Sequence, residues 1–300
     1  MLVLGAEAQE RRLPRALQPG DGVALVAPAR FAMPELIEDA ASQVSAAGFR
    51  PVIPPGLDAR ENQFGGSDLH RANVLNGCFR DPAVRAVWAL RGGYGSARLL
   101  PLLDSAAFQS DPKWIVGFSD ITALHAWADR LGIASLHAPV ASTSSAQAGT
   151  PSLWHTLFQP SPPSPPTPPS PPVVGGNLSV LYSLLGTPYF PDVRGCVLLL
   201  EDLDEYLYHI DRMLVAFRLA GVWDTLAGLA VGDFTELRDN TRAFGQAVDN
   251  AFGRDLREMI RDAVPAELPI LWDLPVGHGP INRPVVLGHS GWIVPKFAEI

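Results

Sequence analysis

Residues 114–127 read WIVGFSDITALHAW, and this stretch has the pattern of a strand that turns directly into a helix. The first five residues form a short apolar run rich in strand formers, whereas the residues from Asp120 onward have helical spacing. Ser119 lies at the joint. A sharp turn of this kind pushes the intervening side chain out of the sheet, and the helix N-terminus directs free N–H groups toward negative charge beside it. The alternative is that Ser119 only caps the helix.

Strand-like and helix-like segments alternate through the first half of the chain. We expect strands at 23–27, 51–53, 86–90 and 114–118, and helices at 34–47 and 67–79. This alternation predicts an α/β fold with a mostly parallel sheet and helices on both faces. Ligands bind at the carboxyl ends of the strands in such sheets, which is where Ser119 falls.

A glycine loop follows the predicted strand at 86–90. It reads Arg91-Gly92-Gly93-Tyr94-Gly95-Ser96 and opens a helix. Bare backbone N–H groups in such a loop can hold a phosphate or complete an oxyanion hole. The loop lacks the Gly-Lys-Ser/Thr of a P-loop and the spacing of a dinucleotide-binding fingerprint. Together with a serine elbow, the oxyanion role is the better interpretation.

Acidic residues follow a buried strand in the second half of the chain. Residues 195–200 are apolar, and Glu201-Asp202-Leu203-Asp204-Glu205 comes directly after them. Acids clustered at a strand end repel one another unless a cation or a protonatable partner is near, which suits an acid that orients a histidine. Glu201 is the best placed because it directly follows the strand. A solvated turn before a helix near Tyr208 could account for Asp204 and Glu205.

His278 lies between Gly277 and Gly279, which let the backbone turn freely and allow a substrate to come close. An imidazole titrates near neutrality, as a general base must. The alternative is an ordinary exposed loop histidine. No His, Cys, Asp or Glu grouping has metal-ligand spacing, so we expect neither a metal nor a cofactor.

Ser119, Glu201 and His278 therefore supply a nucleophile, a carboxylate and an imidazole in that order. A serine hydroxyl needs a histidine to take its proton and an acid to hold that histidine in the right tautomer. The constellation predicts a serine hydrolase.

Seven motifs in this order resemble the serine-type LD-carboxypeptidases, which share their fold with the microcin C self-immunity peptidases. The resemblance spans nearly the whole chain. It implies a triad of Ser119, Glu201 and His278, with an oxyanion hole formed by backbone amides of Gly92, Gly93 and Asp120. The motifs are Arg91–Gly95, Gly117–His125, Gly175–Ser179, Leu200–Asp202, Asp211–Leu214, Gly232–Phe234 and Gly277–Gly279.

The resemblance also implies a substrate class. Members acting on cell-wall fragments remove a terminal D-amino acid from the L-centre of a murein tetrapeptide, in the cytoplasm, during peptidoglycan recycling. Members of the immunity branch cut a bond between a peptide or amino acid and a nucleotide-like group. We assign Asn177, Tyr94 and Arg212 to substrate binding, although Arg212 could instead pair with a nearby acid, which we favour. The resemblance further implies a homodimer.

Two segments depart from the family pattern. The chain has His137-Ala138-Pro139 where His-Gly-Pro is usual, and Ala27-Pro28-Ala29-Arg30 where many relatives carry serines. Neither departure involves the triad, but both could reshape the floor of the pocket.

Composition limits the partners and the compartment. The formal charge of -8, from 23 Lys and Arg against 31 Asp and Glu, disfavours nucleic acid and anionic membranes as partners. The two cysteines, Cys78 and Cys196, have no paired spacing, so we expect buried thiols and a reducing compartment. The N-terminal apolar run is too short for a signal peptide, and no run is long enough to span a bilayer. We therefore expect a cytoplasmic protein.

A segment of almost only proline and serine divides the chain. We expect an N-terminal α/β domain at 1–158 with the nucleophile and glycine loop, a Pro-rich linker at 159–172, and a mixed α/β domain at 173–300 with the triad Glu and His. The triad would then be assembled across the interface. Other possibilities are that the Pro-rich segment docks a proline-binding domain, that the protein binds muropeptides without catalysis, and that it is a nucleotide enzyme.

Overall fold

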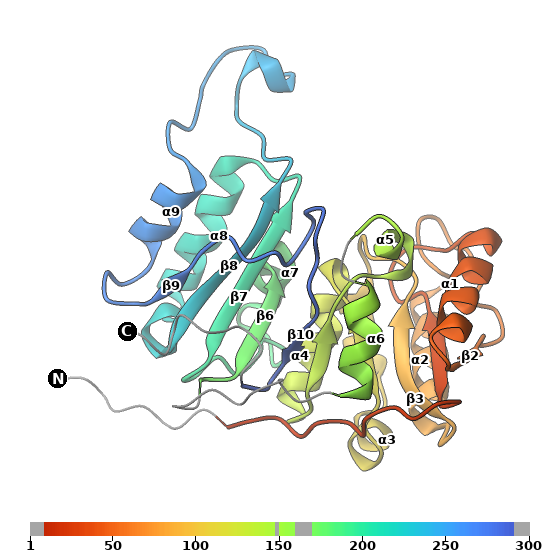
Figure 1. Cartoon of the computed structure of the whole chain (residues 1–300). Helices are drawn as coiled ribbons and strands as arrows, with labels where there is room; N and C mark the ends of the chain where they lie inside the picture. Colours follow the sequence, from red (N-terminus) through yellow and green to blue (C-terminus); the bar gives the residue numbers. More distant parts are fainter. Residues whose placement is uncertain (1–8, 148–149, 160–169, 291–300) are drawn as a thin grey trace.

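The computed structural model describes residues 9–147, 150–159 and 170–290. It contains two sheets that lie side by side, with α4 (Thr122–Arg130) and β10 (Val285–Leu287) between them (Figure 1). The predicted Pro-rich linker falls mostly on residues 160–169, which lie outside the described residues.

The first sheet has six strands. Its order is β10, β5, β4, β3, β1, β2, and every neighbouring pair is parallel except β10 with β5. The mostly parallel sheet predicted from the alternating pattern is therefore confirmed. Besides β10, its strands are β1 (Gly22–Val26), β2 (Arg50–Val52), β3 (Val84–Ala89), β4 (Trp114–Gly117) and β5 (Ser135–His137).

Helices cover both faces of this sheet because its central strands are buried on both sides. In β1, Val23 and Leu25 pack into the apolar cluster of one face, while Ala24 and Val26 pack into the cluster of the other. One face carries α1 (Pro34–Ala46), α5 (Ala141–Ser144) and α6 (Thr150–Phe158), and the other carries α2 (Asp68–Arg80), η1 (Ser96–Leu102), α3 (Ser105–Ser110) and α4.

The second sheet has four parallel strands in the order β6, β7, β8, β9. Helices α7 (Leu178–Leu184), α8 (Leu207–Leu219) and α9 (Leu256–Ala263) pack on one of its faces. The strands are β6 (Val173–Asn177), β7 (Val197–Leu203), β8 (Gly228–Thr235) and β9 (Ile270–Leu271), and the short helices η3 (Trp223–Thr225) and η4 (Arg242–Phe244) lie in the connections.

Strand β10 ties the two sheets together. It pairs antiparallel with β5, with Val285 opposite His137, while Val285 and Leu287 pack against the free face of the second sheet. A segment from the end of the chain therefore completes the sheet of the first half. The two contacts of β10, with β5 and with the second sheet, fix how the two sheets meet.

Strand β7 is longer than the sequence predicts. We expected Glu201 just after the strand, but the strand continues to Leu203 and both Glu201 and Asp202 are buried within it. Pairing with β8 resumes after an irregularity between Leu200 and Asp202. Glu201 and Asp202 therefore lie inside the fold, whereas Asp204 is exposed and Glu205 is half-buried in the segment that leads to α8.

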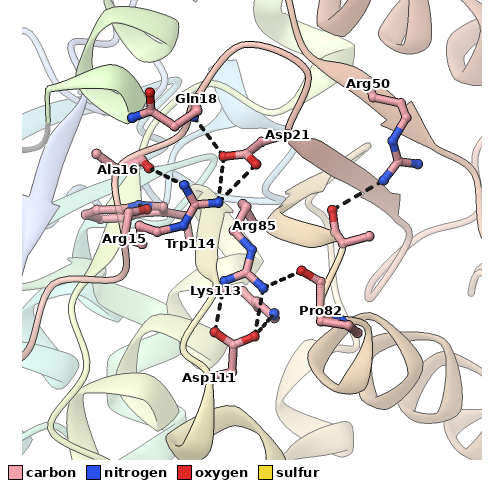
Figure 2. A network of polar contacts seen from close by, with 11 residues as sticks. Arg15, Ala16, Gln18, Asp21, Arg50, Pro82, Arg85, Asp111, Lys113 and Trp114 are labelled. Carbon is pink, nitrogen blue, oxygen red and sulfur yellow. Dashed lines mark hydrogen bonds and ion pairs between the residues drawn. The ribbon is translucent and has the colours of Figure 1, made fainter.

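Charged side chains hold the start of β4, at the end of the strand opposite Ser119 (Figure 2). Asp111 accepts hydrogen bonds from Arg85 and from the fully buried Lys113. The bond from Arg85, helped by Lys113, outweighs burial and lowers the pKa of Asp111 to about 2. The carboxyl end of the strand is left for the site.

In the described part of the chain we find no helix with the length and hydrophobicity needed to cross a bilayer.

Candidate active site

Ser119 stands on a strained turn at the end of β4. It opens the short helix η2 (Ser119–Ile121), which continues into α4. Its φ of 61° lies in the left-handed region that residues with a side chain rarely adopt. No side chain caps η2 or α4, so Ser119 is not the predicted alternative, a helix cap. The residue is half-buried.

Two residues support this turn. A Cβ atom on Gly117 would lie 2.8 Å from Ile121 Cγ1, so the close packing of strand and helix requires glycine. His125 Nε2 donates to the carbonyl oxygen of Gly117 at 2.9 Å, and its Nδ1 accepts from Ser135 Oγ at 2.9 Å. Burial lowers the pKa of His125 to about 3, so the ring is neutral and can play both roles. The sequence placed His125 in the Gly117–His125 motif but did not indicate this role.

The glycine loop lies directly against Ser119. A Cβ atom on Gly92 would be 3.1 Å from Ser119 Oγ and 3.7 Å from the backbone nitrogen of Asp120. Asp120 connects the two segments, because its buried carboxylate accepts from the backbone N–H of Ser96 at 2.8 Å. Burial raises the pKa of Asp120. The backbone of Gly92 therefore lies beside the Ser119 side chain.

Glu201 and His278 form a hydrogen-bonded pair. His278 Nδ1 donates to Glu201 Oε2 at 2.6 Å, with Glu201 fully buried and the His278 side chain 12% exposed. Burial acts to raise the pKa of Glu201, but the imidazoles of His137 and His278 outweigh it and the pKa is lowered. Burial acts to lower the pKa of His278, but Glu201 outweighs it and the pKa is raised. His278 is therefore not the exposed loop histidine of the alternative interpretation.

The glycines around His278 make room for Glu201. A Cβ atom on Gly277, whose φ is +124°, would lie 2.9 Å from Glu201 Oε2. The loop is also clamped from the first half of the chain, since Gln147 Nε2 donates to the carbonyl oxygens of Gly277 and Gly279 at 3.0 Å each. The histidine is thus held in place, although its two neighbouring glycines let the backbone turn freely.

The two halves of the chain meet beside Ser119. The ring of Phe118 lies 4.7 Å from the imidazole of His278, centroid to centroid. The backbone N–H of Asn177 donates to Thr122 Oγ1 at 3.0 Å. The residues predicted for the triad and the oxyanion hole thus come from both sheets and gather at their border.

The three predicted substrate-binding residues differ in their surroundings. Asn177 Oδ1 accepts from Val180 N–H at the start of α7, and its Nδ2 donates to Asp202 at 2.8 Å, so both amide atoms are used inside the protein. Tyr94 is 51% exposed on the glycine loop.

Arg212 does not form the ion pair that we favoured with any described acid. Its guanidinium carbon instead lies 5.3 Å from the ring centroid of Tyr208, one helical turn away on α8.

No metal cluster occurs in the described ranges, since no three His, Cys, Asp or Glu side chains are grouped to bind an ion. Cys78 and Cys196 are buried free thiols, as the sequence predicts. Burial raises the pKa of Cys78 to about 12 and that of Cys196 to about 11, which makes both poor nucleophiles.

Two family models match most of the chain. The model of the LD-carboxypeptidase N-terminal domain matches residues 23–138, and that of the C-terminal domain matches residues 170–292. The fold and the matches define a serine-type carboxypeptidase, a hydrolase. The chain belongs to the LD-carboxypeptidase family.

Named relatives and solved structures cover almost the whole chain. The murein tetrapeptide carboxypeptidase of Pseudomonas aeruginosa is 29% identical over 290 residues, which is 89% of this chain and 91% of that protein. The crystal structure of muramoyltetrapeptide carboxypeptidase from Oxalobacter formigenes has a TM-score of 0.76 at 26% identity, covering 90% of this chain and 93% of that one. The structure of MccF in complex with glutamyl sulfamoyl guanosine has a TM-score of 0.77 at 18% identity, covering 93% and 94%.

Proposed function

We propose that this protein hydrolyses the bond between an L-centre and a terminal D-amino acid in a murein tetrapeptide. Ser119 is the nucleophile, His278 the general base and Glu201 the acid that orients it. The observation that carries this proposal is the 2.6 Å hydrogen bond between His278 and Glu201, next to a strained serine at a strand end.

The first half-reaction transfers the acyl group to Ser119. The carboxylate accepts from Nδ1, which leaves His278 Nε2 with the lone pair that takes the proton of the hydroxyl. Ser119 Oγ bonds to the scissile carbonyl carbon, and the negative oxygen that results is stabilised by backbone amides of Gly92, Gly93 and Asp120. The carbon–nitrogen bond then breaks, and His278 returns the proton to the leaving amine.

The second half-reaction frees the enzyme. His278 takes a proton from water, and the resulting hydroxide oxygen bonds to the carbonyl carbon of the acyl-enzyme. The bond to Ser119 Oγ breaks, and the hydroxyl regains its proton from His278. The products are the shortened peptide and a free amino acid.

The proposed substrate class is supported by relatives whose names refer to murein tetrapeptide or muramoyltetrapeptide. Tyr94, Arg212 and Asn177 are the proposed substrate-binding residues, of which Tyr94 and Arg212 are exposed and Asn177 is buried. We also propose a homodimer and a cytoplasmic location, the latter consistent with two reduced cysteines. We keep the division into residues 1–158 and 173–300 as the proposed domains, with β10 exchanged into the first sheet.

One experiment separates the candidate functions. The purified protein and its Ser119→Ala variant are incubated with murein tetrapeptide and, separately, with an aminoacyl sulfamoyl adenosine, and the products are identified by mass spectrometry. Release of D-alanine by the wild type alone supports the proposal. Cleavage of only the nucleoside substrate supports the activity suggested by the MccF neighbour. Binding of tetrapeptide without cleavage supports a muropeptide-binding protein.

A further inference from the structure

Only one oxygen of the Glu201 carboxylate is accounted for by the pair with His278. Oε2 accepts from His278 Nδ1, whereas Oε1 has no hydrogen-bond partner among the described residues. Glu201 is fully buried. Because a buried charged oxygen is unfavourable without a donor, the structure around Oε1 should contain one.

His137 is the side chain that faces this oxygen. Its Nε2 lies 4.0 Å from Glu201 Oε1, and both side chains are fully buried. Neither ring nitrogen of His137 has a hydrogen-bond partner in the described part of the chain. Two buried polar groups that each lack a partner thus face each other on the side of Glu201 away from His278.

The fold holds His137 at this place. It ends β5, where it is paired with Gly117 of β4 and with Val285 of β10. The Phe118 ring packs edge-on against it at 5.8 Å, and the neutral His125 ring lies 6.3 Å away. The strand carrying His137 is therefore the one that connects the Ser119 turn with the segment following the His278 loop.

We propose that His137 is a second positioning residue for the reaction, donating a hydrogen bond from Nε2 to Glu201 Oε1. A carboxylate only accepts, so Nε2 must carry the proton. A movement of about 1 Å brings the two atoms to an ordinary hydrogen-bond distance. Glu201 is then held between two imidazoles, which fixes the plane of its carboxylate and the direction in which Oε2 holds His278.

This role rests on the proposed function and makes a specific electrostatic prediction. The titratable groups that act on the Glu201–His278 pair are His137, Asp202 and Asp233. A donor to Oε1 stabilises the negative charge that the pair carries when His278 is neutral. Loss of the donor raises the proton affinity of the pair, so the pKa of His278 rises further.

The test compares two variants of His137. His137→Gln retains an N–H group near the position of Nε2, whereas His137→Phe retains the bulk and removes the donor. We expect His137→Phe to lower kcat roughly 10- to 100-fold, as loss of comparable outer partners does elsewhere, with KM nearly unchanged. We also expect it to move the acid limb of kcat/KM upward by roughly one pH unit. His137→Gln should stay close to wild type in both.

A second readout does not depend on activity. The His278 ring is titrated by NMR with 13C-labelled histidine and assigned by its loss in a His278→Gln variant. A raised pKa in His137→Phe but not in His137→Gln supports the proposal even if no substrate is cleaved, which separates it from failure of the proposed function. Exposed His155 on α6 offers a matched control as His155→Phe. An unchanged His278 titration in both His137 variants, or equal loss of kcat in both with no shift, overturns the proposal.

Discussion

Gly176 lies so close to Thr122 that a Cβ atom on Gly176 would be 2.6 Å from Thr122 Oγ1. Gly176 belongs to β6 of the second sheet, and Thr122 begins α4 three residues after Ser119. The contact therefore sets the distance between the sheet that carries Glu201 and the turn that carries Ser119. A small change in this distance should therefore lower the turnover rate.

Gly176→Ala should reduce both stability and turnover. The new methyl group clashes with Thr122, and the φ of +136° is unfavourable for alanine, so we expect a loss of about 1–3 kcal/mol in the free energy of unfolding. Thermal unfolding and kcat are measured together. Gly186→Ala is the matched control, because φ is also positive there but no atom lies within 4 Å of the new Cβ. If the two variants have equal kcat, the contact does not align the site.

Ser119 should show a conflict between activity and stability. Ser119→Ala should fold normally and lower turnover roughly 10^4-fold, as loss of a triad member does elsewhere. Ser119→Gly should be equally inactive but more stable than Ser119→Ala by about 1 kcal/mol, because a φ of 61° is no strain for glycine. Denaturant unfolding compares the two variants. A variant with a tenth of wild-type turnover would exclude Ser119 as the nucleophile.

The local pattern of the sequence was enough to predict β1, β2, β3 and β4 of the first sheet and the three segments of the proposed triad. Each of these features is encoded within about ten residues, as in the strand, turn and helix around Ser119. Contacts between distant segments were not predictable in this way. β5 and β10 were not predicted, and they pair although Val285 is far from His137 in sequence.

The role of Gly277 shows the same limit. The sequence suggested that a glycine beside His278 lets a substrate approach, and the structure shows that it lets Glu201 approach. Both explanations need a residue without a side chain, so composition alone cannot separate them. The boundary of β7 was wrong for a related reason: charged residues usually end a buried strand, but Glu201 is stabilised there by two histidines from elsewhere in the chain.

The pH dependence of the reaction should report on the Glu201–His278 pair. Because Glu201 raises the pKa of His278, and the base must be neutral, the acid limb of kcat/KM should lie above the ordinary 6.5 of histidine. Glu201→Gln removes this charge, so the limb should move to lower pH while kcat falls by about 10^4-fold. The profile is measured for both proteins. If the acid limb of kcat/KM lies at the same pH in the wild type and in Glu201→Gln, it reports the titration of a group other than His278.

The same pair has opposite effects on stability at the two ends of the pH range. The pKa of Glu201 is lowered in the folded protein. The carboxylate therefore contributes fully to the free energy of unfolding above pH 4.5, the ordinary pKa of the group. This contribution is lost as the pH falls through the lowered pKa of the folded protein. The pKa of His278 is raised in the folded protein. The protonated imidazole therefore contributes fully to the free energy of unfolding below pH 6.5, the ordinary pKa of the group, and this contribution is lost as the pH rises through the raised pKa. In Glu201→Gln, the free energy of unfolding measured with urea should depend less on pH at both ends of the range.

Gln147 should matter for catalysis although it touches neither the proposed nucleophile nor Glu201. Its Nε2 donates to the two carbonyl oxygens on either side of His278, so it holds the loop from the opposite half of the chain. Gln147→Glu replaces that donor by an acceptor of the same shape, which repels both carbonyls. We expect kcat to fall roughly 10- to 100-fold in Gln147→Glu. In Gln147→Leu kcat should fall less, because that change removes the attraction without adding repulsion.

Gln43→Leu is the control, since it also loses side-chain hydrogen bonds, to Asp39 and Ser144, but none of them reaches the His278 loop. Should Gln147→Glu keep wild-type kcat, the clamp would be a packing feature and the loop would owe its position to Glu201 alone.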